Sequence, residues 1–220
     1  MTGLPPTRWA LAGPDRTAGF GRKFADLVAS GEDVDGEARL ADTLLPRSGR
    51  VLDVGSGMGR VAAALVSRGH QVVAVEPDPA LVAQSRRTFP EVDVIEADAL
   101  ALDDDLLGER ARVFDLVVCV GNVVVFLAEG TERRLLTLLR DRLAPGGRVL
   151  VGFHLTGGPA DARDYPPGEF VTDVEAAGLR VDQRFGSYEL HPAGDEYAVW
   201  VLSAADAHAP TTEFGHPVRD

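Results

Sequence analysis

The stretch VLDVGSGMGR, at residues 51–60, decides how the rest of the chain is interpreted. It begins as a short apolar, β-branched run typical of a buried strand, and apolar residues at helical spacing follow it. Gly55, Gly57 and Gly59 stand between the strand and the helix, and Asp53 precedes them. Glycine permits a positive φ and lets backbone amides approach a ligand, and the helix that follows presents free N–H groups. The sequence therefore predicts a ligand-binding turn.

The same alternation of strands and helices continues along the chain. Strands are expected at 50–54, 71–76, 92–98, 114–120, 148–155, 179–190 and 196–204. Helices are expected at 17–30, 36–45, 58–69, 78–89, 131–147 and 169–178. Short links between alternating strands and helices are typical of a parallel sheet with helices on both faces and a ligand site at the carboxyl ends of its strands. We expect an α/β, doubly wound, seven-stranded sheet, mostly parallel with an antiparallel last strand, and a helical N-terminal cap.

Length and composition limit the classes of function. The chain of 220 residues carries 34 acidic and 22 basic residues, for a net charge of −12. Such a surface repels phosphate backbones, so we expect no nucleic-acid partner. No apolar run approaches the roughly 20 residues of a membrane helix, and the N-terminus has no basic start followed by an apolar stretch. We expect a cytoplasmic protein with no membrane partner, as a monomer or homodimer.

The spacing of the glycine-rich turn separates two classes of ligand. A turn that binds a dinucleotide has the pattern G-x-G-x-x-G, and this chain has Arg60 where the last glycine would stand. A pyrophosphate gains nothing from the carboxylate of Asp53, whereas a ligand with an ammonium or sulfonium group does. Spacing and charge together favour S-adenosylmethionine over NAD.

On these residues the chain resembles the class I S-adenosylmethionine-dependent methyltransferases, over about residues 36–204. The resemblance implies a Rossmann-like fold, S-adenosylmethionine as cofactor and S-adenosylhomocysteine as product. The implied cofactor-binding positions are Asp53, Gly55, Ser56, Gly57, Met58 and Gly59 at the methionine part, Glu76 at the ribose hydroxyls, Pro77, Asp98 and Ala99 at the adenine, and Val120, Gly121 and Asn122 beside the methyl group. The domains expected are an arm and cap helix at 1–35, the methyltransferase domain at 36–204 and a loose tail at 205–220.

Two further stretches point to a subgroup. GEAR at 36–39 and GNVVVFL at 121–127 are similar to small, poorly characterised bacterial members of the family. In that subgroup an N-terminal helix carries an aromatic residue and an arginine over the cofactor, a pattern from which this chain departs. Phe20 and Lys23 stand at the matching positions and are candidates for the substrate side or a lid.

Candidate residues for the chemistry follow the fourth and fifth strands. His154 is a candidate base for an acceptor that enters protonated, with a structural hydrogen-bonding role as the alternative. Asn122 is a candidate for orienting the acceptor or the cofactor amine, or it shapes the turn. Tyr165 lies in the Gly- and Pro-rich stretch 156–168, a candidate lid, with surface packing as the alternative.

The acceptor class is inferred from a missing motif and from the net charge. No Asn/Asp-Pro-Pro-aromatic motif follows the fourth strand, where base-modifying members of the family carry one. With the net charge this favours a small-molecule acceptor, with a protein acceptor as the alternative. His191, His208 and His216 have no metal-ligand spacing, so we expect no metal. Two alternatives remain open at this point: a nicotinamide-dependent oxidoreductase on a Rossmann fold, and a non-catalytic S-adenosylmethionine-binding protein.

Overall fold

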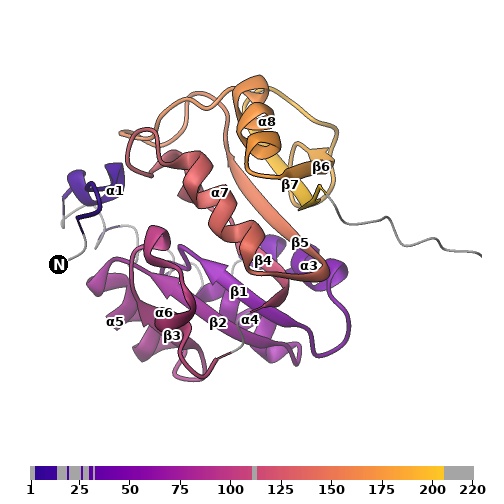
Figure 1. The fold of residues 1–220 in the computed structure, drawn as a ribbon. Coiled ribbons are helices and arrows are strands. Elements are labelled where there is room, and N and C mark those ends of the chain that lie inside the picture. The colour runs from indigo at the N-terminus through magenta and orange to yellow at the C-terminus, as the bar shows by residue number, and fades with distance from the viewer. Residues whose placement is uncertain are drawn as a thin grey trace, which may run out of the picture.

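The computed structural model describes residues 3–13, 33–110 and 113–205, together with Gly19, Asp26, Ser30 and Gly31 (Figure 1). Its centre is a seven-stranded sheet with the strand order β3-β2-β1-β4-β5-β7-β6. The strands are β1 (Arg50–Val54), β2 (Gln71–Glu76), β3 (Asp93–Glu96), β4 (Phe114–Cys119), β5 (Leu143–His154), β6 (Leu179–Phe185) and β7 (Tyr197–Ala204). β7 runs antiparallel to both neighbours, and β1 to β5 pair in parallel. The predicted mostly parallel sheet with an antiparallel last strand is confirmed.

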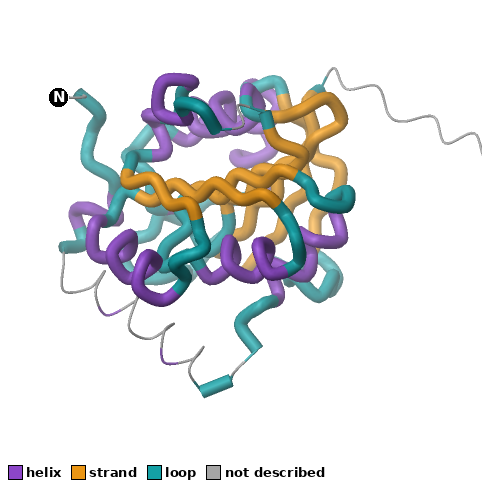
Figure 2. Tube along the Cα trace, turned by 90° about the horizontal axis from the view of Figure 1, so that it is seen from below, coloured by secondary structure: helices purple, strands orange, loops and turns teal. Residues whose placement is uncertain are grey.

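Helices cover both faces of this sheet (Figure 2). One face packs against α3 (Gly36–Leu44), α4 (Arg60–Ser67) and α5 (Pro79–Thr88). The other packs against α6 (Asp104–Leu107), α7 (Glu132–Asp141) and α8 (Pro167–Ala176). Because successive side chains of a strand point to opposite faces, neighbours such as Val51 and Leu52 belong to different halves of the core. Strands buried on both faces explain the continuous apolar runs in the sequence.

Local signals account for several element boundaries. The Asp78 side chain accepts hydrogen bonds from the backbone N–H groups of Ala80 and Leu81 and so caps α5, as the sequence predicts. α3 ends at Leu44, just before Pro46, which cannot continue a helix. Gly178 follows α8 with a φ of +75°, a conformation that glycine adopts without strain.

The helix predicted at 131–147 is too long. α7 ends at Asp141, and the stretch from Leu143 already belongs to β5, where Leu143 pairs with Phe114. Leu143 continues the helical spacing of apolar residues, but Pro145 lacks an N–H group and Gly146 has a φ of +78°, so the chain extends instead. β3 ends at Glu96 and β6 at Phe185, both earlier than predicted, while α8 begins two residues early at Pro167.

Four short elements were not predicted: α1 (Arg8–Leu11), η1 (Ala99–Ala101), α6 and η2 (Val123–Val125), where η denotes a 3₁₀ turn. All are too short to show a periodicity in the sequence. The expected helix at 17–30 falls largely outside the described residues, as does the tail from residue 206. Within the described part of the chain, no helix is long and apolar enough to span a bilayer.

Candidate functional site

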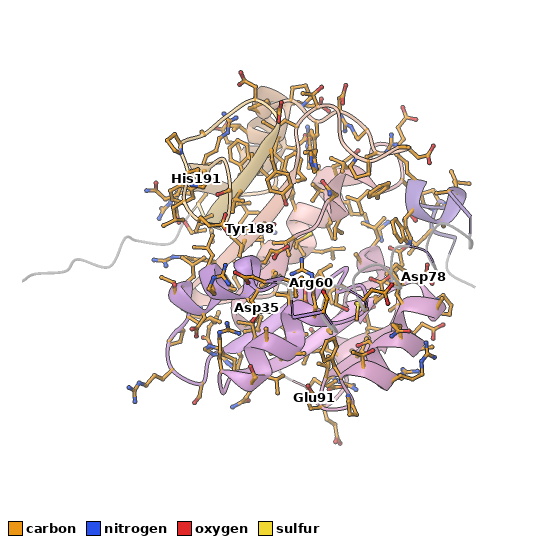
Figure 3. The ribbon with its side chains drawn as sticks, turned by 180° about the vertical axis from the view of Figure 1, so that it is seen from behind. Asp35, Arg60, Asp78, Glu91, Tyr188 and His191 are labelled. Carbon is orange, nitrogen blue, oxygen red and sulfur yellow. The ribbon has the colours of Figure 1, made fainter. Side chains whose placement is uncertain are left out.

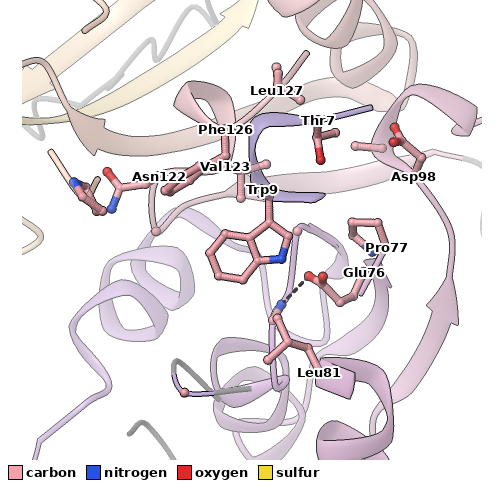
Figure 4. Close-up of a pocket in the computed structure, with 16 residues that line it drawn as sticks. Thr7, Trp9, Glu76, Pro77, Leu81, Asp98, Asn122, Val123, Phe126 and Leu127 are labelled. Atoms are coloured by element: carbon pink, nitrogen blue, oxygen red, sulfur yellow. Dashed lines mark hydrogen bonds between the residues drawn. The ribbon is translucent and has the colours of Figure 1, made fainter. Parts of the chain in front are cut away.

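A cavity of about 450 Å³ opens at the carboxyl ends of the parallel strands (Figure 4). It lies at the point where the strand order reverses between β1 and β4, which is where doubly wound sheets bind ligands. The described residues that line it are Thr7, Trp9, Gly19, Gly55, Gly57, Glu76, Pro77, Leu81, Asp98, Ala99, Gly121, Asn122, Val123, Phe126, Leu127 and Pro159.

The glycine-rich turn forms the floor of this cavity. Gly55 has a φ of +71°, and a Cβ atom there would lie 2.4 Å from a methyl carbon of Val123, so no larger residue fits without displacing that side chain. Gly57 has a φ of +59°, and a Cβ atom there would meet nothing within 4 Å. Gly55 therefore lets the Val123 side chain pack against the turn, and Gly57 leaves open space where a side chain would stand.

Glu76 ends β2 and places its carboxylate in the cavity lining. Oε2 accepts a hydrogen bond from the Gly57 N–H at 2.8 Å, and Oε1 accepts one from the Asp78 N–H at 2.9 Å. The side chain is only 4% exposed, and burial raises its pKa to about 7 despite these two hydrogen bonds. Each oxygen keeps a lone pair, so the carboxylate can accept two more hydrogen bonds from a vicinal diol.

Asp53 lies beneath the turn rather than in the cavity lining. Its side chain is 2% exposed, and its Oδ2 has no hydrogen-bond partner among the residues that the structure describes. Burial raises the pKa of Asp53 to about 7, and the positive charge of Arg60 opposes this effect. The Ser56 hydroxyl in the same turn is likewise buried without a partner there. Buried polar atoms left unpaired at a turn indicate a place for a polar ligand group or for water.

Asp98 stands on the far side of Glu76, after β3. Its Oδ1 accepts a hydrogen bond from the Leu100 N–H at 2.8 Å and so caps η1, while the residue as a whole also lines the cavity. Ala99 follows it in the lining, and Pro77 and Leu81 add apolar surface nearby. This end of the cavity is therefore lined by three apolar residues and one carboxylate.

Asn122 and His154 form a joined pair after β4 and β5. Asn122 Oδ1 accepts a hydrogen bond from the His154 backbone N–H at 2.9 Å and lies 3.0 Å from the His154 ring nitrogen Nδ1. Because a backbone N–H can only donate, the amide atom that faces both groups is the oxygen, and Nδ1 carries the ring proton. In the neutral ring Nε2 is therefore the acceptor. Asn122 lines the cavity; His154 is half-buried behind it, with its ring edge against Tyr197.

The comparisons with known proteins agree with this geometry. Residues 51–147 match a family model described as a methyltransferase domain. The chain is also similar to a TehB-like SAM-dependent methyltransferase from Corynebacterium glutamicum: the two are 32% identical, the match covers 87% of this chain and all of that one, and the TM-score is 0.75.

This chain belongs to the class I S-adenosylmethionine-dependent methyltransferases. S-Adenosylmethionine is its cofactor, which decides against the nicotinamide alternative. The methyltransferase is also 28% identical over 194 residues to a ubiquinone biosynthesis O-methyltransferase of Xanthomonas axonopodis pv. citri, covering 77% of that protein. It is 36% identical over 108 residues to a ribosomal RNA small subunit methyltransferase C of Chromohalobacter salexigens, but spans only 32% of that protein's length.

The residues at the cavity have the chemical groups that S-adenosylmethionine requires. The carboxylate of Glu76 lines the cavity with free lone pairs, and Gly57 adds no side chain that would fill the space beside it. The unpaired atoms of Asp53 and Ser56 add polar groups at the same turn. These are the groups expected to bind a diol and an amino-acid end, and all of them come from the strand ends that the sequence singled out.

Other predicted positions lie elsewhere. Besides Asp53, four predicted cofactor-binding positions do not line the cavity: Ser56, Met58, Gly59 and Val120. Met58 and Val120 are buried, and Gly59 directly precedes α4. Phe20 and Lys23 lie outside the described residues.

The lid hypothesis for Tyr165 needs correction. Tyr165 has no exposed surface, its ring packs against Phe153 and Phe170, and its hydroxyl donates to Asp173 at 2.8 Å. It is a core residue that anchors the end of its loop, and the residue of that loop that lines the cavity is Pro159.

Several lining residues were missed. Val123, Phe126 and Leu127 belong to the GNVVVFL stretch, whose apolar letters could have indicated a cavity wall. Trp9 gave no signal, because it stands in a Pro- and Gly-rich arm without periodicity. His191 lies in the exposed turn between β6 and β7, apart from Asp78 beside the cavity (Figure 3). Among the described residues, no group of His, Cys, Asp and Glu side chains could hold a metal ion.

Proposed function

We propose that this methyltransferase acts on a small-molecule acceptor that enters beside Asn122 and His154. Two observations support a small acceptor over a nucleic acid. The net charge is −12, and the charged residues among the described lining of the cavity are Glu76 and Asp98, both acids. A polyanion would meet only repulsion there. The names of the similar proteins do not decide the matter, since one is a quinone-pathway O-methyltransferase and another acts on ribosomal RNA.

The cofactor is proposed to lie along the glycine-rich turn. Glu76 accepts hydrogen bonds from both ribose hydroxyls, Asp98 and the Ala99 N–H meet the adenine, and Pro77 lies against its ring. Asp53 and the turn hold the methionine part, where the ligand's positive charge favours the ionised carboxylate. When bound, the cofactor supplies a methyl group made electrophilic by the positive sulfur.

The chain's own contribution is alignment and the exclusion of water. Methyl transfer is an in-line displacement, so the acceptor atom has to be held behind the methyl group. Val123, Phe126 and Leu127 give the cavity an apolar wall that keeps water away from the reacting atoms. Asn122 stands in the lining at the open end and orients the acceptor through its side-chain amide.

His154 is proposed to remove the acceptor's proton. The observation that carries this role is the hydrogen bond to Asn122, which assigns the ring proton to Nδ1 and leaves Nε2 with a lone pair. A base is needed where the acceptor is a hydroxyl or an ammonium group, because such a group is a poor nucleophile until the proton leaves.

One experiment tests the acceptor class. Purified protein is incubated with isotopically labelled S-adenosylmethionine and, in separate reactions, with the small-molecule fraction of a bacterial extract, with total RNA and with total protein. We expect label in the small-molecule fraction only, identified by mass spectrometry. Label in RNA or protein alone would contradict the proposal.

A second experiment tests His154 once an acceptor is known. His154→Gln keeps a hydrogen-bonding side chain but removes the base, and we expect kcat to fall about a hundredfold or more while S-adenosylhomocysteine affinity stays unchanged. Turnover at the wild-type rate would leave His154 as a structural partner of Asn122. His191→Gln, in the exposed turn, is the control variant.

A further inference from the structure

Helix α1 lies across the mouth of the cavity. Its Trp9 stands in the middle of the lining, between Asn122 and Glu76 (Figure 4). The Thr7 side chain caps the helix by accepting a hydrogen bond from the Ala10 N–H, and Thr7 also lines the cavity. We call residues 7–11 the strap.

The strap is fastened on both sides of the cavity. On the β2 side, the Trp9 indole N–H donates to Asp78 Oδ2 at 3.2 Å. On the β4 side, the Trp9 backbone N–H donates to the Phe126 carbonyl at 3.3 Å, and the two rings meet edge to face at 5.3 Å. Asp78 also donates its own N–H to Glu76, so the turn that holds the strap is the turn that holds the proposed ribose acid.

The strap also contacts the buried carboxylate of Glu132. The Arg8 guanidinium donates to the Leu127 carbonyl at 2.7 Å and lies 3.8 Å from Glu132 Oε1. The Glu132 side chain is 5% exposed and also accepts a hydrogen bond from Arg163 at 2.8 Å. Arg163 follows Pro159 in the loop that completes the cavity wall. Glu132 thus joins the two segments, strap and loop, that close the same cavity.

Among the residues that the structure describes, the strap is held mainly by these contacts of Arg8 and Trp9. The helix within it, α1, has four residues. None of them is buried, and Leu11 is 71% exposed. A helix of one turn is unstable by itself, so its position depends on the contacts of Arg8 and Trp9. Segments with few buried apolar contacts open at low free-energy cost, ahead of global unfolding.

We propose that the strap closes over the cofactor with Trp9 in direct contact with it, and that the Arg8–Glu132 contact sets the rate at which S-adenosylhomocysteine leaves. The inference rests on the cofactor position proposed above. Trp9 is then a cofactor-positioning residue, since its indole covers the ligand between Glu76 and Asn122. Cofactor exchange requires the strap to detach from both sides.

Tryptophan fluorescence tests the contact. The chain has two tryptophans, and the other, Trp200, is 2% exposed in β7 within the core. We expect S-adenosylhomocysteine to change the emission of the wild-type protein and to leave that of Trp9→Phe unchanged, while calorimetry shows binding by both. Binding without a Trp9-dependent change overturns the strap and leaves the cofactor site standing. Absence of binding to the wild-type protein overturns both.

The rate of S-adenosylhomocysteine release tests the role of the Arg8–Glu132 contact. Protein loaded with S-adenosylhomocysteine is rapidly diluted, and the recovery of Trp9 emission gives the rate. We expect Glu132→Gln and Arg8→Gln each to release the product about fivefold faster, as the loss of one partly buried charged contact predicts. Arg8→Gln serves as the independent variant, because Arg8 lies outside the core and its loss leaves Arg163 on Glu132.

Arg133→Gln is the matched control. Arg133 neighbours Glu132 on α7, its side chain is 56% exposed, and it pairs with Asp173 instead of the strap. Its release rate should equal that of the wild-type protein. Wild-type rates in both Glu132→Gln and Arg8→Gln overturn the fastening role, and so does an equal acceleration in Arg133→Gln.

Discussion

The glycine-rich wall of the cavity consists of Gly55, Gly57 and the buried carboxylate of Glu76, whereas the outer wall consists of the strap, η2 and a loop that ends in the core. In the first wall, the Glu76 carboxylate accepts backbone hydrogen bonds from Gly57 and Asp78, in the turns that follow β1 and β2. In the second, a four-residue helix without a buried residue depends on side-chain contacts. On the proposal above, the first wall sets the geometry of binding and the second sets access to the cavity.

Breaking the glycine-rich wall should have the largest effect. Gly55→Ala combines a left-handed φ with a Cβ atom 2.4 Å from Val123, so both strain and overlap disturb the turn. We expect a loss of about 2 kcal/mol or more in the free energy of unfolding. We also expect S-adenosylhomocysteine affinity to fall about tenfold or more. Denaturant unfolding and calorimetric titration measure the two effects.

Gly69→Ala is the control for strain alone. Gly69 follows the far end of α4 with a φ of +90°, and a Cβ atom there would meet nothing within 4 Å. We expect about 1 kcal/mol of destabilisation from the backbone conformation and an unchanged affinity. Wild-type affinity in Gly55→Ala would show that the close approach to Val123 does not shape the cofactor site.

The charge of Glu76 should make cofactor affinity depend on pH. Burial raises the pKa of Glu76 to about 7 in the free protein, and hydrogen bonds from ribose hydroxyls favour the ionised form. Binding therefore releases a proton near neutrality, and affinity should rise about tenfold from about pH 6 to about pH 8. Titration calorimetry in buffers of different ionisation enthalpy counts the protons released.

The free energy of unfolding should fall as pH rises, whereas cofactor affinity should increase. Both Asp53 and Glu76 have a pKa of about 7 in the folded protein, well above their ordinary values. Between those values the folded chain holds protons that the unfolded chain has lost, so the free energy of unfolding falls as pH rises toward about 7. Glu76→Gln and Asp53→Asn should each flatten both pH profiles in part. Unchanged profiles in both variants would refute the assignment.

The contrast between the walls also explains what the sequence could predict. Glu76 and Asp98 follow apolar strands in regular alternation, and the parallel topology brings such positions to one edge, where both line the cavity. Trp9 meets Asp78 and Phe126, which lie far along the chain, and one helical turn has no periodicity to reveal it. His154 and Asn122 could be singled out separately, but their shared hydrogen bond depends on the register of β4 and β5.

The smallest expected effect is that of a change at Tyr165. This residue lies where the loop of the outer wall enters the core. Removing its hydroxyl in Tyr165→Phe deletes the hydrogen bond to Asp173, and we expect a loss of about 1 kcal/mol in the free energy of unfolding. Cofactor affinity should not change. Thr172→Ala, which removes an exposed hydroxyl from α8, should alter stability by less than about 0.5 kcal/mol.

A changed S-adenosylhomocysteine affinity in Tyr165→Phe would mean that the anchor of the loop reaches the ligand through Pro159. Burial, followed by the bond to Asp173, raises the pKa of Tyr165 and keeps the phenol a neutral donor. The hydroxyl therefore remains a hydrogen-bond donor to Asp173 at neutral pH. Movement of the outer wall is then assigned to the strap, whose helix has no buried residue.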